Sequence, residues 1–408
     1  MVRRSVYLHE LLKWRDEKVI KVITGLRRCG KSTLLLQFQE ELINKGTDPS
    51  QIISLNFEAL ENEALLDYHT LYKHIIDQLI PDRMNYIFLD EIQLVNDFQK
   101  AVDSLYIREN VDLYITGSNA YLLSGELATL LSGRYIEVNV LPFSFKEFFE
   151  LNPSEDRDQS FQKYLRFGSM PYIAGISDPA EKADAYLEGI YNTIIVKDIE
   201  LRQQRLEKDN PNKRKITDLA LLKTIAKYLA SSIGNPIAVN HILASVNKTG
   251  RKISFNTIDD YVEALIEPYL FYKAERFDVI GKQLLKQNYK LYISDLGLRR
   301  HLLPRMEYDL GHSLENIVYL ELLRKGFAVN NGKVGQTEVD FVVKKGDIYS
   351  YYQVTASMLE QTTFDREMAP LKQIRDNYPK SVLTLDRFTE GNYEGIEVMN
   401  MIDWLLKE

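Results

Sequence analysis

A phosphate-binding loop stands near the start of the chain, where residues 25–32 read GLRRCGKS and fit the pattern G-x-x-x-x-G-K-[ST]. A triphosphate crowds several negative charges on one face, and Gly25 and Gly30 allow backbone N–H groups to approach it closely. A helix that starts near Lys31 points its positive end at the same anion. Lys31 can reach the β- and γ-phosphates, and Ser32 is placed to bind Mg2+. The loop therefore predicts binding of ATP with Mg2+.

The expected nucleotide contacts are the residues of this loop and the one after it. They are Gly25, Leu26, Arg27, Arg28, Cys29, Gly30, Lys31, Ser32 and Thr33. Cys29 has two interpretations, a redox-sensitive thiol near the phosphates or a small side chain that fills the loop, and the second is favoured.

Two acids, Asp90 and Glu91, follow the four apolar residues at 86–89. Such a run fits a strand buried on both faces of a parallel sheet, and ligands bind at the carboxyl ends of strands in such sheets. We expect Asp90 to hold Mg2+ and Glu91 to polarise the attacking water. The alternative is a strand followed by solvated acids in a turn, but the pattern is that of a Walker B strand.

Three further residues are candidates for the hydrolytic site. Ser118 and Asn119 follow the strand expected at 111–116 and could sense the γ-phosphate, although Thr-Gly-Ser-Asn is also ordinary turn chemistry. Arg134 could stabilise charge on the transferring phosphoryl group, either in its own subunit or from a neighbouring one. A surface arginine is the alternative. The predicted catalytic residues are thus Lys31, Glu91, Asn119 and Arg134.

The elements around these residues predict an α/β fold. Strands are expected at 19–24, 51–57, 85–89, 111–116 and 136–140, with a helix after the loop, which is typical of a P-loop NTPase with a mainly parallel sheet between helices. We assign residues 1–141 to this core. Residues 142–207 are mostly helical by pattern and predict a helical lid, and the charged, proline-broken stretch 208–215 predicts a linker.

Residues 216–300 predict a winged-helix domain, with helices at 219–233, 239–246 and 254–266 and a hairpin through Gly281. Lys248, Arg251 and Lys252 precede the third helix and suit phosphates of a nucleic acid. Winged helices also bind proteins, and acids at 259, 260 and 263 on that third helix favour this alternative slightly.

Residues 301–408 form the last predicted domain, a small α/β unit. A helix at 314–321 and strands at 338–343 and 349–355 resemble the restriction-endonuclease-like PD-(D/E)xK core. Its chemistry needs two metal-binding carboxylates and a lysine. Asp340 supplies one carboxylate and Glu315 or Glu321 a second, but Gln353 stands where an acid belongs and Thr355 where the lysine belongs. We therefore expect a degenerate site rather than an active nuclease.

The composition of the chain limits the classes of protein to which it can belong. The chain has 408 residues, which suggests two or three domains, and with 45% hydrophobic and 27% charged residues it can form sizeable cores. No apolar run is long enough for a membrane helix and no signal-peptide core follows Met1, so a cytoplasmic protein without membrane contact is expected. The single cysteine excludes an intramolecular disulfide. A net charge of −7 argues against a surface coated for nonspecific nucleic-acid binding.

Taken together, the chain resembles the prokaryotic AAA-type P-loop ATPases that carry a C-terminal domain of unknown function. The resemblance rests on VITGLRRCGKS at 22–32, LDEIQ at 89–93, TGSN at 116–119, SGR at 132–134, LPFSF at 141–145 and EVDF at 338–341. It implies ATP and Mg2+ binding, hydrolysis, and a nuclease-like tail that is often incomplete.

Two roles fit this resemblance. In the first, hydrolysis drives a DNA or RNA transaction in which the winged helix and tail grip the nucleic acid. In the second, the ATPase is a switch for protein partners and the tail is a docking module. The oligomeric state is left open.

Overall fold

The computed structural model describes residues 2–117, 133–153, 156–176, 178–199, 216, 218–247, 253–303 and 309–407. The chain forms two compact units. The first contains Met1–Leu141 with Glu267–Tyr269, and the second contains Pro142–Ile266 with Leu270–Glu408. The predicted linker at 208–215 and the end of the predicted lid at 200–207 lie outside the described residues. The finer division into lid, winged helix and C-terminal domain stays a prediction.

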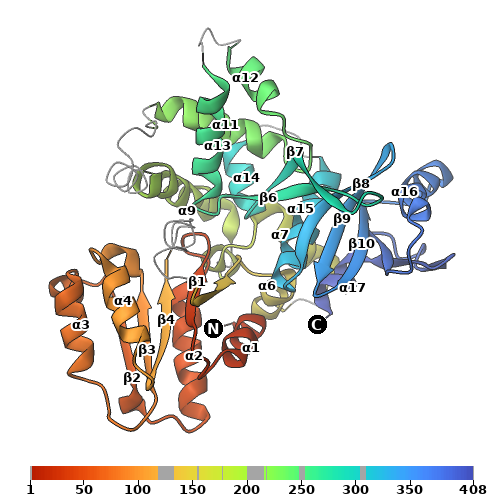
Figure 1. The fold of residues 1–408 in the computed structure, drawn as a ribbon. Helices are drawn as coiled ribbons and strands as arrows, with labels where there is room; N and C mark the ends of the chain where they lie inside the picture. Colours follow the sequence, from red (N-terminus) through yellow and green to blue (C-terminus); the bar gives the residue numbers. More distant parts are fainter. Residues whose placement is uncertain are drawn as a thin grey trace. The chain divides into compact units, whose positions relative to one another are not determined.

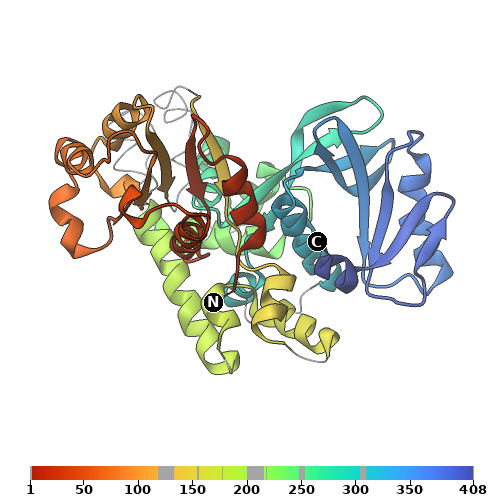
Figure 2. The ribbon, with the colours of Figure 1, turned by 90° about the horizontal axis from the view of Figure 1, so that it is seen from below.

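The first unit is built on a five-stranded sheet (Figures 1 and 2). Its order is β2-β3-β4-β1-β5, and all four strand pairings are parallel. The strands are β1 Ile20–Thr24, β2 Ile52–Asn56, β3 Asn85–Asp90, β4 Val111–Thr116 and β5 Tyr135–Asn139. The helices are α1 Ser5–Lys13, α2 Lys31–Asn44, α3 Tyr68–Ile76 and α4 Phe98–Tyr106, with short 3-10 turns at Pro49–Gln51, Leu60–Leu65 and Ile92–Leu94. The predicted α/β P-loop NTPase fold is confirmed for this unit.

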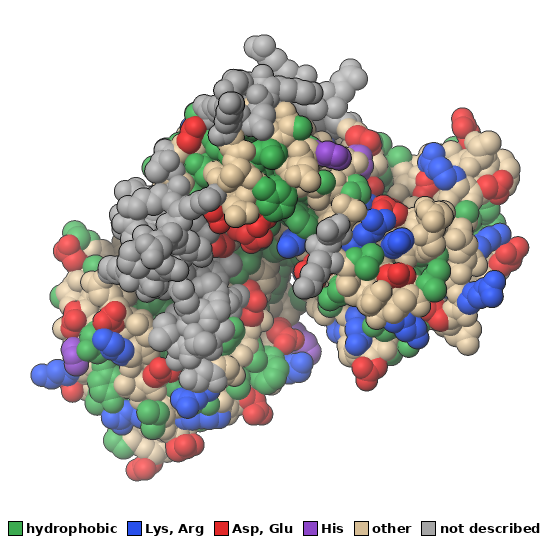
Figure 3. Space-filling model, turned by 45° about the horizontal axis from the view of Figure 1, so that its top comes forward, with side chains coloured by type: hydrophobic (Ala, Val, Ile, Leu, Met, Phe, Trp, Pro, Cys, Tyr) green, Lys and Arg blue, Asp and Glu red, His purple; other side chains and the backbone are tan. Residues whose placement is uncertain are grey.

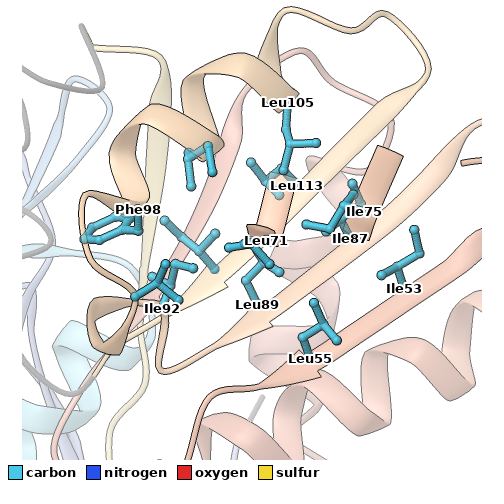
Figure 4. Packing of buried hydrophobic residues seen from close by; sticks show 14 of the residues in the cluster. Ile53, Leu55, Leu71, Ile75, Ile87, Leu89, Ile92, Phe98, Leu105 and Leu113 are labelled. Atoms are coloured by element: carbon cyan, nitrogen blue, oxygen red, sulfur yellow. The ribbon is translucent and has the colours of Figure 1, made fainter. Parts of the chain in front are cut away.

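Helices cover both faces of this sheet because its strands are apolar on both sides. On one face α3 and α4 pack on strand side chains such as Ile87 and Leu113 (Figure 4). On the other face Phe38 of α2 lies against Phe88 and Tyr114, with ring centroids 6.2 and 5.1 Å away. Strands buried in this way place their carboxyl ends along one edge, where the loops that follow them can bind a ligand.

The second unit contains an eight-stranded mixed sheet of order β12-β13-β11-β10-β9-β8-β6-β7. Its strands are β6 Phe271–Asp278, β7 Gln283–Ile293, β8 Ala328–Val334, β9 Thr337–Lys345, β10 Ile348–Thr355, β11 Lys380–Thr384, β12 Gly391–Tyr393 and β13 Ile396–Asn400. Helices α15 (Leu310–Arg324) and α16 (Gln361–Gln373) cover opposite faces of it (Figure 1). Neighbouring residues of β9 show this alternation, since Phe341 packs near Tyr319 of α15 and Val342 belongs to the cluster that contains Met368 of α16.

Most of the remaining helices of the second unit precede this sheet in sequence, whereas α14 lies between β7 and β8 and α17 follows the last strand. They are α6 Phe145–Leu151, α7 Arg157–Phe167, α8 Pro171–Ala174, α9 Pro179–Thr193, which continues as a π-helical turn at Ile194–Asp198, α11 Leu219–Ser231, α12 Val239–Asn247, α13 Phe255–Ile266, α14 Leu296–Leu302 and α17 Met401–Leu406. Three helices and the β6–β7 hairpin are therefore present where the sequence predicts a winged helix. The hairpin is part of the same sheet as β8–β13, and the predicted boundary between 300 and 301 falls within α14.

A helix must be long and apolar along its length to cross a lipid bilayer. None of the described helices could span a membrane.

Candidate nucleotide site

The phosphate-binding loop follows β1 directly, and two of its positions require glycine. Gly25 has a φ of +138°, and a Cβ there would lie 2.2 Å from the carbonyl oxygen of Val140. Gly30 has a φ of +103° and precedes the first residue of α2, Lys31. These backbone conformations are costly for other residues. The loop thus reaches the helix N-terminus with its amides free of side chains, which is the cradle that a triphosphate needs.

The side chain of Arg4 supports the loop, and no sequence pattern indicated this role. Its side chain is 1% exposed. One guanidinium nitrogen donates to the carbonyl oxygen of Cys29 at 3.0 Å and another donates to that of Leu141 at 2.7 Å. Arg4 therefore ties the loop to the segment that follows β5. A lone arginine before a helix is common, so only the tertiary structure identifies it.

Cys29 is fully buried inside the loop. Burial raises the pKa of its thiol, although the charges of Lys31 and Arg4 oppose this. Since the thiolate is the reactive form, this environment favours the interpretation of Cys29 as a loop filler over a redox-sensitive thiol.

Lys31 is held at the centre of the loop and is 4% exposed. Its ammonium donates to the carbonyl oxygens of Gly25 and Leu26, at 3.1 and 3.3 Å, and lies 3.9 Å from Glu91 Oε1. The loop carbonyls and the acid that follows β3 thus position one positive charge at the N-terminus of α2. This is the arrangement that the motif predicted for binding phosphate.

Asp90 and Glu91 lie at the carboxyl end of β3, close to Lys31 and Ser32 of the phosphate-binding loop. The Thr116 hydroxyl donates to Asp90 Oδ1 and accepts from the Glu91 backbone N–H at 2.9 Å. Burial raises the pKa of Asp90, while hydrogen bonds from Thr116 and Ser32 lower it. Ser32 and Asp90 are therefore in contact, and a hydroxyl beside a carboxylate is an oxygen donor set that fits Mg2+.

The backbone conformation and the contacts of Glu91 suit a general base whose carboxylate is held in one orientation. Its backbone is left-handed, with φ of +55°, which is uncommon for a residue other than glycine and often marks a functional site. The Gln93 side-chain amide donates to Glu91 Oε2. The carboxylate is thus oriented by its neighbours on both oxygens, by Gln93 on one and by Lys31 nearby on the other.

Thr116 is a site residue whose individual role was not predicted. It belongs to the Thr-Gly-Ser-Asn motif, but the residues predicted to sense the γ-phosphate are Ser118 and Asn119, which follow it. Thr116 ends β4, the neighbour of β3, with Leu89 opposite Ile115 in the parallel register. A small hydroxyl residue at the end of the adjacent strand is the signal that could have identified it, because parallel strands end at the same edge.

Three predicted residues of this site remain: Ser118, Asn119 and Arg134. Ser118 and Asn119 lie outside the described residues. Arg134 immediately precedes β5, and the register places Tyr135 opposite Ile20, the first residue of β1. It therefore lies at the amino end of the sheet, about five residues or roughly 16 Å of strand from the loop. Its guanidinium lies over the Tyr106 ring, 5.4 Å from the centroid. This position does not fit a role of Arg134 at its own phosphate loop, and a role in a neighbouring subunit stays a prediction.

Comparison with known proteins gives the family. Residues 17–149 match the family model "AAA domain", and residues 158–309 match a "Domain of unknown function (DUF8612)". An uncharacterized protein of Haemophilus influenzae is 37% identical over 413 residues, which cover 100% of this chain and 99% of that protein. The chain belongs to the same family as this Haemophilus influenzae protein. Another uncharacterized protein, from Methanocaldococcus jannaschii, is 31% identical and aligned over 93% of this chain and 84% of its own length.

Solved structures resemble this AAA-domain protein only at low overall similarity. The Walker-type ATPase of Pyrococcus abyssi has a TM-score of 0.45 at 16% identity, with 74% of this chain and 96% of that chain covered. DnaA from Aquifex aeolicus bound to AMPPCP has a TM-score of 0.28 at 14% identity, with 63% and 85% covered. The assignment of this protein as an AAA-type P-loop ATPase rests on the family model and on the loop and strands described above.

The second unit of this AAA-domain protein brings together part of the predicted nuclease-like set. Asp340 accepts from the Val354 backbone N–H at 2.8 Å, and its own N–H donates to the Gln353 side-chain oxygen at 3.2 Å. Of the two candidate second acids, Glu315 is close enough to Asp340 for the charge of Asp340 to raise its pKa further, in addition to the effect of burial. Glu321 instead pairs with Arg324 at 3.1 Å.

The Thr355 hydroxyl donates to the carbonyl oxygen of Ser357, two residues further along the chain, at 3.2 Å. The position predicted for lysine thus carries a locally bonded threonine. A lysine nevertheless lies near Asp340: it is Lys290 of β7, which no sequence motif indicated.

Proposed function

We propose that this AAA family member hydrolyses ATP with Mg2+ at the loop from Gly25 to Thr33. The observation that carries the proposal is the edge formed by Lys31, Ser32, Asp90, Glu91 and Thr116. There one buried ammonium, two hydroxyls and two carboxylates lie within hydrogen-bonding or ion-pairing distance of a partner in the same set. Phosphate release from ATP tests this hydrolytic part directly.

The chemistry follows from the roles of these side chains. Lys31 and the N-terminal amides of α2 bind the phosphates, because a buried ammonium and a helix N-terminus both favour an anion. Ser32 and Asp90 would hold Mg2+, which neutralises charge on the phosphate oxygens when bound. Glu91 accepts a proton from the attacking water, and Gln93 orients the carboxylate for it. Thr116 fixes the two acids relative to each other through its hydroxyl.

The proposal extends to the second unit, whose arrangement would depend on the nucleotide state. Helices α11–α13 and the β6–β7 hairpin support a winged-helix module, and α15, β9 and β10 support a degenerate nuclease-like one. Both module types favour a nucleic-acid transaction, with DNA or RNA as the partner. The basic residues expected to contact phosphates, Lys248, Arg251 and Lys252, lie outside the described residues.

A specific observation favours a switch for protein partners as the second candidate. Asp259 is exposed and Asp260 and Glu263 are half-buried on α13, the helix that would read DNA. Figure 3 shows basic and acidic side chains interspersed over the face in view rather than gathered in one basic patch. Acids on a reading helix oppose phosphate contacts through like-charge repulsion.

Binding of fluorescent DNA and RNA by the full chain separates these two candidates. Polarisation is measured without nucleotide, with ADP and with a non-hydrolysable ATP analogue, each over a series of salt concentrations. The nucleic-acid role predicts nucleotide-dependent binding that weakens steeply with salt, because phosphate contacts release counterions. Absence of binding in all three nucleotide states would rule out that role and leave the protein switch.

A further inference from the structure

The second unit contains a group of acids that we call the carboxylate cluster: Glu315 of α15 and Glu338 and Asp340 of β9. Lys290 of β7 points its ammonium at this cluster. Its nitrogen lies 3.9 Å from Glu315 Oε2 and 3.9 Å from Glu338 Oε2, and its side chain is only 6% exposed. A lysine buried to this degree requires carboxylates around it, because an isolated charge is expensive to bury.

The electrostatics of the cluster are consistent with Lys290 as its main counter-charge. Burial alone would lower the pKa of Lys290, but the charges of Glu315, Asp340 and Glu338 raise it. Burial raises the pKa of Asp340 to about 6, and Lys290 is the first of the groups that oppose this shift. For Glu315, burial and then the charge of Asp340 raise the pKa, and Lys290 again lowers it. Asp340 and Glu315 are thus both held closer to their ionised forms by the same ammonium.

The rest of the cluster is occupied by protein groups, which leaves few oxygen atoms for a metal. Arg276 donates to Glu338 Oε1 at 2.7 Å. Asp340 Oδ2 accepts from the Val354 backbone N–H at 2.8 Å. Among the described residues, no group of three or more His, Cys, Asp or Glu residues is arranged to hold a metal ion. The residues present therefore do not fit the metal that a nuclease of this core would use.

We propose that Lys290 takes the place of a divalent metal in the carboxylate cluster. The ammonium supplies the positive charge that the acids need, and it occupies the space between Glu315 and β9 from which a metal would contact both. The cluster is then a metal-free site that stabilises the second unit, and it acquires metal affinity only when the charge of Lys290 is removed. This inference is independent of ATP hydrolysis in the first unit.

Terbium(III) binding to the full chain tests the proposal, because this hard cation takes the same oxygen ligands as Mg2+ or Ca2+ and emits when a nearby tyrosine absorbs light. Tyr292, whose hydroxyl is 3.5 Å from Glu315 Oε2, is the sensitiser. All variants also carry Asp90→Asn and are measured without nucleotide. Terbium bound at the phosphate loop then makes a small contribution to the emission that is the same in every variant. We expect Lys290→Met to gain one equivalent of bound terbium that disappears when Asp340→Asn is added.

The matched control is Lys282→Met, which removes an exposed lysine near the turn of the same β6–β7 hairpin and should gain no terbium. Thermal unfolding reports whether each variant is folded, and Lys290→Gln replaces Lys290→Met if the latter does not fold. Two results would overturn the proposal. One is Asp340-dependent terbium binding while Lys290 is present, and the other is no gain of terbium in a folded Lys290 variant.

Discussion

Replacing Lys31 by alanine is expected to weaken ATP binding by about 10- to 100-fold, because hydrogen bonds to charged groups contribute about 1.5–3 kcal/mol each and 1.4 kcal/mol is a factor of ten. The ammonium is buried beside the carbonyls of Gly25 and Leu26, so no solvent cation can replace it at that position. The dissociation constant is measured by isothermal titration of the full chain with a non-hydrolysable ATP analogue and Mg2+.

The matched control for Lys31→Ala is Lys45→Ala. Lys45 directly follows the C-terminal end of the same helix, α2, and its side chain is 46% exposed. This substitution removes the same charge from the chain and should change nucleotide affinity by less than about twofold, since exposed ion pairs contribute little. Equal affinities of Lys31→Ala and Lys45→Ala would show that the loop is not the phosphate site.

Glu91→Gln is expected to preserve ATP binding and to slow turnover by about 10²- to 10⁴-fold, the range that a general base contributes. Glutamine keeps the size of the side chain but cannot accept the proton of the attacking water. The steady-state rate of phosphate release and the affinity for the ATP analogue are both measured, because the proposal requires that they separate.

The control for Glu91→Gln is Glu63→Gln, an exposed acid of the same unit outside the predicted site, which should keep the full rate. If Glu91→Gln turned over at the rate of the unchanged chain, the assignment of Glu91 as the base would be wrong. If it lost binding and turnover together, Glu91 would instead have a structural role in positioning Lys31.

The strands and the residues of the phosphate loop could be predicted because their signals are local. Gly25, Lys31 and Ser32 belong to one short motif, and Asp90 with Glu91 follow an apolar run that only a buried strand explains. The sheet of the first unit places both sets at one edge, as expected for parallel strands whose carboxyl ends lie together. For these residues, the position predicted from the sequence motifs agrees with the position in the fold.

The residues that were missed act across long sequence separations. Arg4 contacts the carbonyl of Leu141, and Thr116 bonds Asp90 from the adjacent strand. Lys290 interacts electrostatically with Asp340 although β6 and β8 separate their strands in the sheet, whereas the motif pattern placed the lysine at position 355. Arg134 shows the converse, since its spacing from the motifs did not reveal that it lies at the amino end of β5. These contacts depend on register and strand direction, which a linear pattern does not specify.

Phosphate release from ATP by the purified full chain, followed with and without Mg2+, tests the central claim most directly. The account predicts steady release in the presence of Mg2+ that falls to background when the metal is chelated, because Ser32 and Asp90 provide its oxygen ligands. ATP binding without any release above background in Mg2+ would contradict the claim that this edge of the sheet is a hydrolytic site.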